Sequence, residues 1–380
     1  MIRWSEAVVS ALGRRRPGAV ELTVRLEAGA EALPALAYTD VVGEPQVGDR
    51  CLVNTNALAR GLGTGGLAMV VALPDRLPTP VDAPGHLVKA RYTPLQAMVL
   101  GVDEQESPHH GLLREADDLA GMPVVAADLH SSLPAVLAGV RAEAPDLRVA
   151  YVMTDGGALP AAFSRTSSAL REAGWLVSVV TTGQSYGGDL EAVTVHTGLL
   201  AARLVAQADL VVVTQGPGNL GTGTRWGVSG VAAGEALNAA AVLRGRGVAA
   251  LRVSGADPRS RHRAVSHHSV TAYGRVLARP ADVVVPELSA CPDVPADLAA
   301  AVTDDVRRLC AAAPHLAPVL VRCTDLGQAL DAVPVPLSTM GRGYAQDPAA
   351  FLAAAAAGRH AARLVLGTQQ PPAASGSGGC

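Results

Sequence analysis

The sequence predicts an α/β protein in which a small antiparallel β-barrel precedes a doubly wound, mostly parallel sheet. Residues 1–80 contain short alternating segments separated by Gly, Pro and Asp, a pattern typical of antiparallel strands. From residue 87 onward, continuous apolar runs alternate with helical segments, as in a parallel sheet covered on both faces. Four prolines in the twelve residues 74–85 indicate a connection between these parts, and we place the linker at 81–86.

The barrel is predicted from five strand-like segments in the first 80 residues. Each combines β-branched or alternating apolar residues with turn residues at its ends. Five short strands within this length suit a small barrel better than a sandwich, and GRRRPG at 13–18 suits a hairpin turn. The segments are EAVVSAL (6–12), AVELTVRLE (19–27), LPALAYTD (33–40), DRCLVNTNA (49–57) and LAMVVAL (67–73).

The α/β domain is predicted at 87–366, followed by a disordered Gly-, Ser- and Pro-rich tail at 367–380. Its strands are apolar throughout, which is the pattern of strands buried on both faces. Connections between such parallel strands are right-handed, so the helices are expected on both sides of the sheet. The strand segments are 95–102, 122–127, 147–153, 175–180, 208–215, 248–254, 281–286 and 317–322.

Composition limits the classes of partner and compartment. The net charge is −3 and no basic run dominates, so nucleic acid is not an expected partner. No charge-free apolar run reaches about 18 residues, and the first residues do not match a signal peptide. We therefore expect a cytoplasmic protein without a membrane partner. Lys89 is the only lysine, which excludes the lysine-bearing phosphate loop, and we expect it at the surface of the domain junction.

The loops that follow the predicted strands are candidate sites, because open α/β sheets bind ligands beyond the carboxyl ends of their strands. The loop after 147–153 holds Thr154, Asp155, Gly156 and Gly157. The two glycines let the backbone approach a ligand at the start of the next helix. We predict ligand binding there, with a plain helix cap as the alternative.

The loop after 208–215 is the richest in glycine. Residues 216–221 match G-x-G-x-x-G, but they follow roughly the fifth strand, and the nearest acid, Asp257, is too distant for a dinucleotide fingerprint. A glycine-rich turn with hydroxyl and guanidinium donors suits a phosphate or carboxylate instead, so we predict a small-molecule anion as partner. A purely structural loop is the alternative. The predicted anion-binding residues are Gly218, Asn219, Gly221, Thr222, Thr224 and Arg225.

The loop after 248–254 gathers arginines and histidines. Arg261 and His262 would reinforce the binding of an anion. His267 and His268 are the candidate acid–base catalysts, because imidazole titrates near neutral pH. A solvated basic loop is the alternative.

Two other kinds of site find less support. Polar clusters at 103–110 and 128–131 could assemble a metal site, but neither has a recognised ligand spacing, so we predict none. The segment 163–168 (FSRTSS) lacks the flanking glycines of a serine nucleophile elbow, which argues against a serine hydrolase. No pattern specifies a cofactor.

Seven stretches together resemble a bacterial family that is known as domain of unknown function 3866. They are LGTGG (62–66), VKARYTPLQ (88–96), DEQESPHH (103–110), TDGGALPAAFS (154–164), GPGNLGTGTRWGVSG (216–230), RHRAVSHHS (261–269) and STMGRG (338–343). The resemblance spans nearly the whole chain and implies an intracellular bacterial protein. It carries over no activity, cofactor or catalytic residue.

Three functions therefore stay open from the sequence. The first is an enzyme that acts on a small phosphorylated or carboxylated metabolite with histidine acid–base chemistry. The second is a non-catalytic sensor that binds a nucleotide or metabolite through the same loops. The third is a structural or assembly protein, for which a large apolar surface patch is expected in place of a cleft. The composition also allows a homo-oligomer without specifying one.

Overall fold

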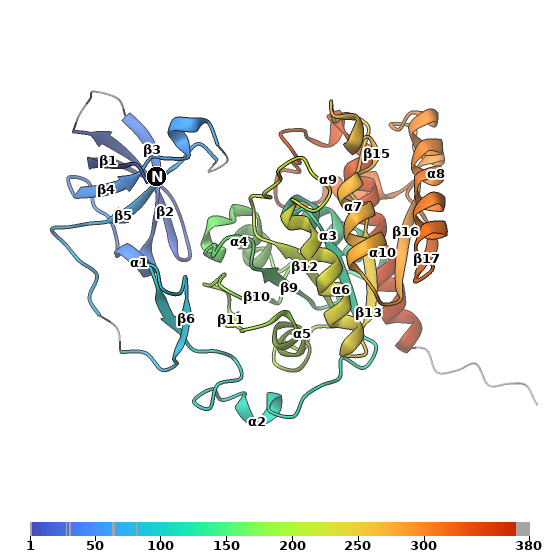
Figure 1. Ribbon diagram of the computed structural model, residues 1–380, viewed down its shortest axis with the longest axis horizontal. Helices are drawn as coiled ribbons and strands as arrows, with labels where there is room; N and C mark the ends of the chain where they lie inside the picture. Colours follow the sequence, from blue (N-terminus) through green and yellow to red (C-terminus); the bar gives the residue numbers. More distant parts are fainter. Residues whose placement is uncertain (1, 28, 30–31, 63–64, 81, 370–380) are drawn as a thin grey trace, which may run out of the picture.

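The computed structural model describes residues 2–27, 29, 32–62, 65–80 and 82–369. Figure 1 shows a β-barrel built by the N-terminal segment beside a larger body in which helices surround a sheet. Both parts of the predicted fold class are confirmed. Of the predicted tail, residues 367–369 continue the last helix, and 370–380, including Cys380, lie outside the described residues.

The barrel is closed by five strands in the order β1-β2-β3-β5-β4. Four of its five pairings are antiparallel, and the pairing of β3 with β5 is parallel. Alternate side chains point inward, so that Val20, Leu22 and Val24 of one strand are buried in the barrel core. The strands are β1 (Trp4–Arg16), β2 (Ala19–Leu26), β3 (Ala32–Tyr38), β4 (Arg50–Asn54) and β5 (Ala68–Ala72), which confirms the five predicted segments.

The barrel docks on the larger body through the end of β1 and one apolar contact. Arg16 Nε donates a hydrogen bond to the carbonyl oxygen of Ala162 at 2.6 Å. Leu36 and Leu67 of the barrel pack in one cluster with Phe163, which follows a strand of the larger body. These contacts place the barrel over one edge of the loops described below.

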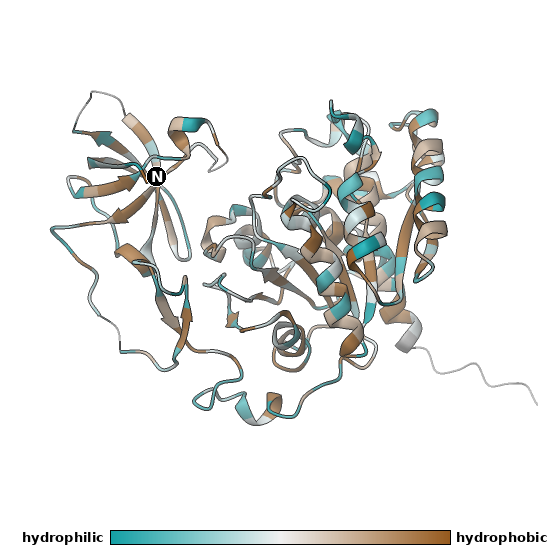
Figure 2. Cartoon of the chain, in the orientation of Figure 1, coloured by the Kyte–Doolittle hydropathy of each residue, from teal (hydrophilic) through white to brown (hydrophobic). Residues whose placement is uncertain are grey.

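The large sheet has eight parallel strands in the order β11-β10-β9-β12-β8-β13-β16-β17. All six residues of its central strand β12 are buried, and Figure 2 shows the apolar character of the sheet. This two-sided burial is what the continuous apolar runs predict. The strands are β8 (Pro123–Ala127), β9 (Val149–Thr154), β10 (Ser178–Thr181), β11 (Leu190–Glu191), β12 (Leu210–Gln215), β13 (Arg246–Ala250), β16 (Ala281–Glu287) and β17 (Leu316–Arg322).

Two predicted strands differ from the structure. Of the segment 95–102, only the end reaches the large sheet, through a single parallel bridge from Gly101 to Glu191 of the edge strand β11, whereas β7 (Ala97–Val99) pairs with β6 (Leu87–Lys89). Its central residue is exposed, so this apolar run is not buried on two faces. The segment 248–254 breaks after β13, and its last residues form β14 (Val253–Ser254), which pairs with β15 (Ala264–Val265).

Helices cover both faces of the sheet. Helices α3, α9 and α10 pack on one another over one face of the sheet (Figure 1). Helices α5, α6 and α8 lie in crossover connections between strands and cover the other face. The helices are α1 (Thr39–Val42), α2 (His110–Leu113), α3 (Leu133–Glu143), α4 (Arg165–Glu172), α5 (Val195–Leu204), α6 (Ala232–Val242), α7 (His267–Thr271), α8 (Ala296–Ala312), α9 (Leu326–Asp331) and α10 (Pro348–Gln369).

Helix α10 is the longest helix and lies in the core. Among the described residues it is the one helix long and apolar enough to cross a membrane, and 78% of that apolar stretch is buried inside the protein. It crosses α3 at two glycines. A Cβ atom at Gly139 would lie 1.8 Å from the carbonyl oxygen of Ala355, and one at Gly358 would lie 1.9 Å from that of Val136. The two helix backbones are therefore in direct contact.

Lys89 is fully buried, which corrects the expectation of a surface lysine. Its Nζ lies 3.2 Å from Glu191 Oε2 and donates to the carbonyl oxygens of Ser185 at 2.8 Å and Ala192 at 3.1 Å. Burial lowers the pKa of Lys89 and raises that of Glu191, and the attraction between the two charges opposes both shifts. The lysine joins the segment that follows the barrel to the edge strand of the sheet.

Replacing Lys89 by methionine is expected to lower the free energy of unfolding by about 3 kcal/mol, because a buried carboxylate loses its counter-charge. Urea denaturation measures the loss. Arg91→Met is the matched control: it removes an exposed cation nearby, and its effect is expected within about 0.5 kcal/mol. Adding Glu191→Gln to Lys89→Met should recover part of the loss. Equal effects of Lys89→Met and Arg91→Met would contradict this account.

Candidate functional site

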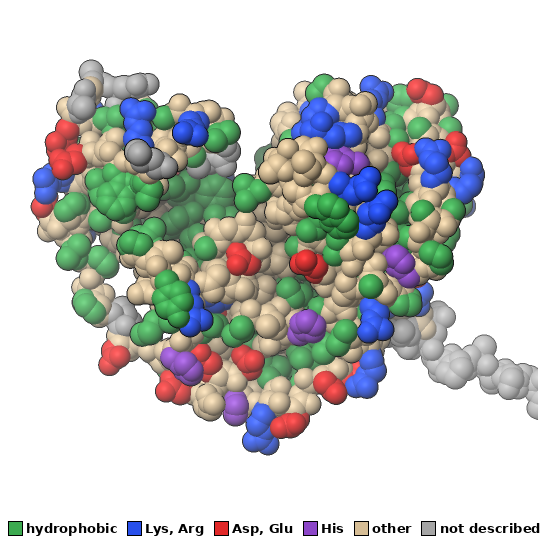
Figure 3. Space-filling view, viewed as in Figure 1, with side chains coloured by type: hydrophobic (Ala, Val, Ile, Leu, Met, Phe, Trp, Pro, Cys, Tyr) green, Lys and Arg blue, Asp and Glu red, His purple; other side chains and the backbone are tan. Residues whose placement is uncertain are grey.

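The candidate site lies where the winding of the sheet reverses. Strand β8 leads into α3 on one face, and its neighbour β12 leads toward α6 on the other, which leaves a crevice between their loops. A cavity of about 580 Å³ opens there. The barrel supplies part of its wall through Arg16, Gly65 and Leu67. Figure 3 shows the hollow between the barrel and the larger body.

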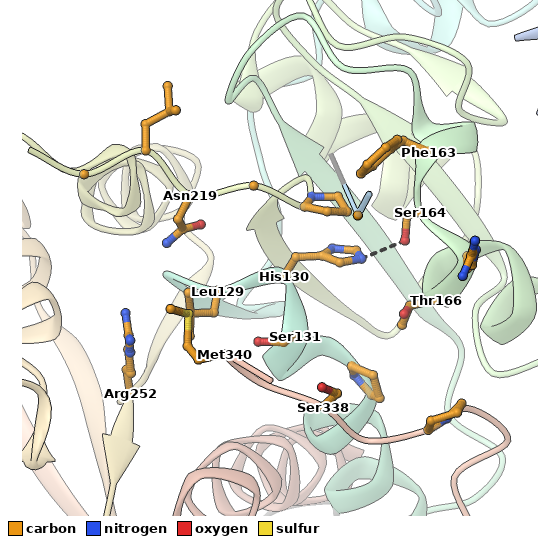
Figure 4. A pocket seen from close by; sticks show the side chains of 18 of the residues that line it. Leu129, His130, Ser131, Phe163, Ser164, Thr166, Asn219, Arg252, Ser338 and Met340 are labelled. Carbon is orange, nitrogen blue, oxygen red and sulfur yellow. Dashed lines mark hydrogen bonds between the residues drawn. The ribbon is translucent and has the colours of Figure 1, made fainter. Parts of the chain in front are cut away.

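A buried histidine and a serine face each other in this cavity (Figure 4). His130 follows β8, and its Nε2 lies 2.7 Å from Oγ of Ser164, which follows β9. The other ring nitrogen, Nδ1, lies 3.0 Å from the hydroxyl of Tyr151. Ser164 is also the N-cap of α4, where its Oγ accepts the Ser167 N–H at 2.9 Å. Both His130 and Ser164 line the cavity.

The hydrogen-bond partners determine where the protons lie. Thr214 Oγ1 lies 2.8 Å from the carbonyl oxygen of Gln215, to which it can donate, and 3.0 Å from the Tyr151 hydroxyl, a contact in which either hydroxyl can be the donor. The Tyr151 hydroxyl also lies 3.4 Å from the carbonyl oxygens of Thr214 and Gln215. A hydroxyl carries one hydrogen, so when Tyr151 donates to Thr214 or to a carbonyl it accepts from Nδ1–H of His130, and Nε2 is then the unprotonated acceptor of the Ser164 hydroxyl. Burial lowers the pKa of His130 to about 4, consistent with this neutral form.

A cluster of arginines forms the opposite part of the site. Arg252 and Arg259 line the cavity and share the buried carboxylate of Asp257. Arg259 binds it in a bidentate manner at 2.9 and 2.8 Å, whereas Arg252 Nη2 and Arg342 Nη2 lie 3.7 and 3.5 Å from Oδ2. The hydrogen bonds from Arg259 are the largest cause that holds the pKa of Asp257 well below its usual range. Arg342 Nε also lies 3.2 Å from Asp347 Oδ2, so three cations share two buried carboxylates.

Three histidines lie beside these arginines, namely His262, His267 and His268. One ring nitrogen from each of them lies within 4.8 Å of the other two. Burial, and then the neighbouring arginine charges, lower all three pKa values, to about 3 for His262 and about 4 for His268. Neutral imidazoles are metal ligands, but the same arginine charges would repel a divalent cation. Arg252 Nη1 also lies 3.5 Å from Nδ1 of His268. This environment favours an anion over a metal ion.

Asp128 lies behind the cavity at the end of β8. Its side chain is buried, and neither carboxylate oxygen has a hydrogen-bond partner among the described residues. Burial raises its pKa to about 6, an effect that the charge of Arg252 opposes. The Asp128 carbonyl oxygen accepts a hydrogen bond from Asn219 Nδ2 at 2.9 Å. This bond ties the loop after β8 to the glycine-rich loop.

The structure brings four of the predicted site residues to the cavity wall: Gly218, Asn219, Gly221 and His268. The others lie elsewhere. His267 and Arg261 line a separate cavity of about 480 Å³ near α8, and His262 is buried with Nδ1 2.8 Å from Ser266 Oγ. The remaining predicted residues are outside the cavity lining, namely Thr154, Asp155, Gly156, Gly157, Thr222, Thr224 and Arg225.

Local contacts explain the positions of those remaining residues. Asp155 Oδ1 accepts the N–H groups of Gly157 and Ala158 and so closes a turn. The expected helix near Ala158 is absent, since α4 begins at Arg165 with Ser164 as its N-cap, so Asp155 does not cap a helix. The hydroxyls of Thr222 and Thr224 lie 3.2 Å apart, and Thr224 Oγ1 accepts the Gly227 N–H. These contacts shape the turns. Their binding roles stay predictions.

Most residues of the cavity wall lie outside the predicted set, among them Arg252, His130 and Ser164. Arg252 is hidden in the apolar segment 248–254, of which only the first half belongs to β13. The sequence indicates His130 only as a member of a polar cluster, and Ser164 lies in a segment without the glycines of a nucleophile elbow. The one available signal is that His130 and Ser164 each follow a strand, and such loops meet at one edge of a parallel sheet.

The fold and the cavity define an α/β protein with a candidate small-molecule site at a topological switch point, bordered by an N-terminal barrel. The chain belongs to the DUF3866 family, described as a protein of unknown function, whose model matches residues 34–358. The resemblance is thereby confirmed. Comparison with curated proteins and with solved structures gives no match.

Proposed function

We propose that this protein binds a small anionic metabolite in the cavity at the carboxyl ends of β8 and β12. One observation carries the proposal: four arginines line the cavity, and no Asp or Glu side chain is among the described residues that line it. They are Arg16, Arg165, Arg252 and Arg259. Its volume of about 580 Å³ is in the usual range for small-molecule sites.

The carboxylates near these arginines do not balance their charge. Arg16 and Arg165 both pair with Glu21, at 2.7 and 2.6 Å. In the second group, three guanidiniums face two carboxylates, Asp257 and Asp347, and Asp347 pairs with Arg342. An excess of positive charge at a partly enclosed cavity favours a phosphate or carboxylate, which guanidinium groups bind with planar, paired hydrogen bonds.

Arg252 is the best placed anchor for such an anion. Its side chain is 8% exposed, and its closest carboxylate oxygen lies 3.7 Å away, beyond hydrogen-bond distance. Its guanidinium is therefore desolvated without a strong partner. An arriving anion would supply that partner, and Coulomb attraction is stronger where water is excluded.

A thermal-shift screen tests this proposal with inorganic phosphate, sugar phosphates, nucleotides and dicarboxylates. At about one hundred times its dissociation constant, a ligand adds about 2.7 kcal/mol of stability, which raises the melting temperature by a few degrees. The shift is expected in the wild type and lost in Arg252→Gln, in which Asp257 keeps Arg259 and Arg342.

Arg225→Gln is the matched control. It removes the same charge from an exposed position in the glycine-rich loop, outside the cavity lining, and should retain the shift. Loss of the shift in Arg225→Gln with retention in Arg252→Gln would place the ligand at the exposed loop and contradict the proposal. A wild type that no anion in the panel stabilises would also contradict it.

A further inference from the structure

We propose that Ser164 is a nucleophile and His130 its general base, so that the cavity hydrolyses an ester of the anionic metabolite. The inference rests on the proposed function for the substrate's anionic group and on the His130–Ser164 contact for the chemistry. An attacking hydroxyl must be within hydrogen-bond reach of an unprotonated base. Ser164 Oγ and His130 Nε2 are 2.7 Å apart and line the same cavity.

The direction of the hydrogen bonds carries the argument. The Tyr151 hydroxyl has three oxygen acceptors within 3.4 Å, on Thr214 and Gln215, and donation to any of them puts the imidazole hydrogen of His130 on Nδ1. Nε2 is then free to receive the Ser164 proton. Tyr151 has the orienting role that an acid has in the familiar serine triads, where a third group fixes the tautomer of the histidine.

The bound anion would also make His130 a stronger base. In the ligand-free protein, burial disfavours the imidazolium. A negative charge in the same cavity favours the imidazolium, so substrate binding raises the basicity of His130 at the moment when Ser164 attacks. The arginines hold the substrate anion, and the negative charge of that anion offsets their positive charge, which would otherwise disfavour protonation of His130.

The reaction balances with water as the second reactant. Ser164 Oγ bonds to the ester carbonyl carbon as its proton moves to His130 Nε2, and His130 then gives that proton to the departing alcohol as the carbon–oxygen bond breaks. Water attacks the resulting acyl-Ser164 with His130 again as base, which releases the carboxylic acid and restores the serine. The first N–H groups of a helix have no intrahelical acceptor, and in this proposal those of Arg165 and Thr166, which follow Ser164 at the start of α4, would donate to the oxyanion.

Covalent labelling with diisopropyl fluorophosphate tests the nucleophile without knowledge of the substrate. Ser164 Oγ displaces fluoride from phosphorus while His130 takes the proton, and intact mass with peptide mapping locates the adduct. The wild type is expected to gain one adduct on Ser164. Ser164→Ala should gain none. His130→Gln should react at least roughly a hundredfold more slowly than the wild type, which is the usual contribution of a general base.

Two variants keep the test decisive. His130→Gln retains Ser164 and its helix cap, so it answers the question if Ser164→Ala fails to fold. Ser168→Ala, a half-buried serine in the same helix and outside the cavity lining, is the matched control and should label at the wild-type rate. An unlabelled wild type, an adduct on another residue or an unchanged rate in His130→Gln would overturn the inference.

The reagent is uncharged, so its reaction does not require the anion site. Absence of labelling together with a retained thermal shift would end this inference and leave the proposed function standing. Labelling of Ser164 without any thermal shift would support the nucleophile and end the proposal of an anionic ligand.

Discussion

Gly139→Ala is expected to lower the free energy of unfolding by more than about 3 kcal/mol, and a protein without native folding at 37 °C would be consistent with this expectation. The new methyl group would lie 1.8 Å from the carbonyl oxygen of Ala355 in α10. A side-chain rotation cannot relieve this clash, because the atom it meets belongs to the backbone. Helices α3 and α10 would have to separate, which would expose the face of the sheet that they cover.

Chemical denaturation of Gly139→Ala against the wild type measures this loss. Gly358→Ala should behave similarly, since its methyl group would lie 1.9 Å from the carbonyl oxygen of Val136. Gly367→Ala in α10 is the matched control: no heavy atom lies within 4 Å of its Cβ position, so it should be neutral or stabilise by up to about 1 kcal/mol. Equal effects at Gly139 and Gly367 would refute the close crossing.

Asp257→Asn is expected to destabilise the protein by about 3–5 kcal/mol, the cost of removing one partner from a buried ion pair. Its carboxylate is fully buried and neutralises part of the charge of Arg252, Arg259 and Arg342. An amide of the same shape would leave these guanidiniums facing one another and would turn a donor toward them. Urea denaturation at pH 7 measures the loss, and Asp146→Asn, at an exposed position, is the control with an expected effect below about 0.5 kcal/mol.

The pH dependence of this loss has a definite sign. The pKa of Asp257 in the folded protein is lowered, chiefly by hydrogen bonds from Arg259, so its contribution is complete above the unfolded value of about 3.9. This stabilising contribution of Asp257 is lost as the pH falls toward and through the lowered pKa that Asp257 has in the folded protein. The difference between wild type and Asp257→Asn should therefore be constant above about pH 5 and shrink in more acidic solution. A difference that grows on acidification would contradict this role.

The elements that the sequence predicted correctly are those whose pattern is local. In the barrel strands, buried residues alternate with more accessible ones, and the strands of the large sheet are buried on both faces. Either pattern can be recognised within a few residues of sequence. The segment 95–102 shows the limit of that signal. Its apolar residues look like a sheet strand, but Met98 is 69% exposed, residues 97–99 form a separate small ladder, and only Gly101 bridges to the large sheet.

The site was less predictable because its partners are distant in sequence. Lys89 is buried only because Glu191 and two carbonyl groups receive its charge, and nothing near Lys89 in the chain indicates them. His130 and Ser164 follow strands β8 and β9, which β12 separates in the sheet. Their 2.7 Å contact depends on this strand order, which the sequence pattern leaves undetermined.

The division of the cavity wall between the barrel and the α/β body has a practical consequence. The two bodies have separate principal cores. A chain cut in the connection between β5 and β6 would give two fragments that each keep their own core, yet neither would hold the whole pocket. A metabolite that contacts both walls would then stabilise the complex of the two fragments, so the fraction of associated fragments would rise with the concentration of the metabolite. Two fluorescent labels, one on each half, would turn this architecture into a sensor that reports its own ligand.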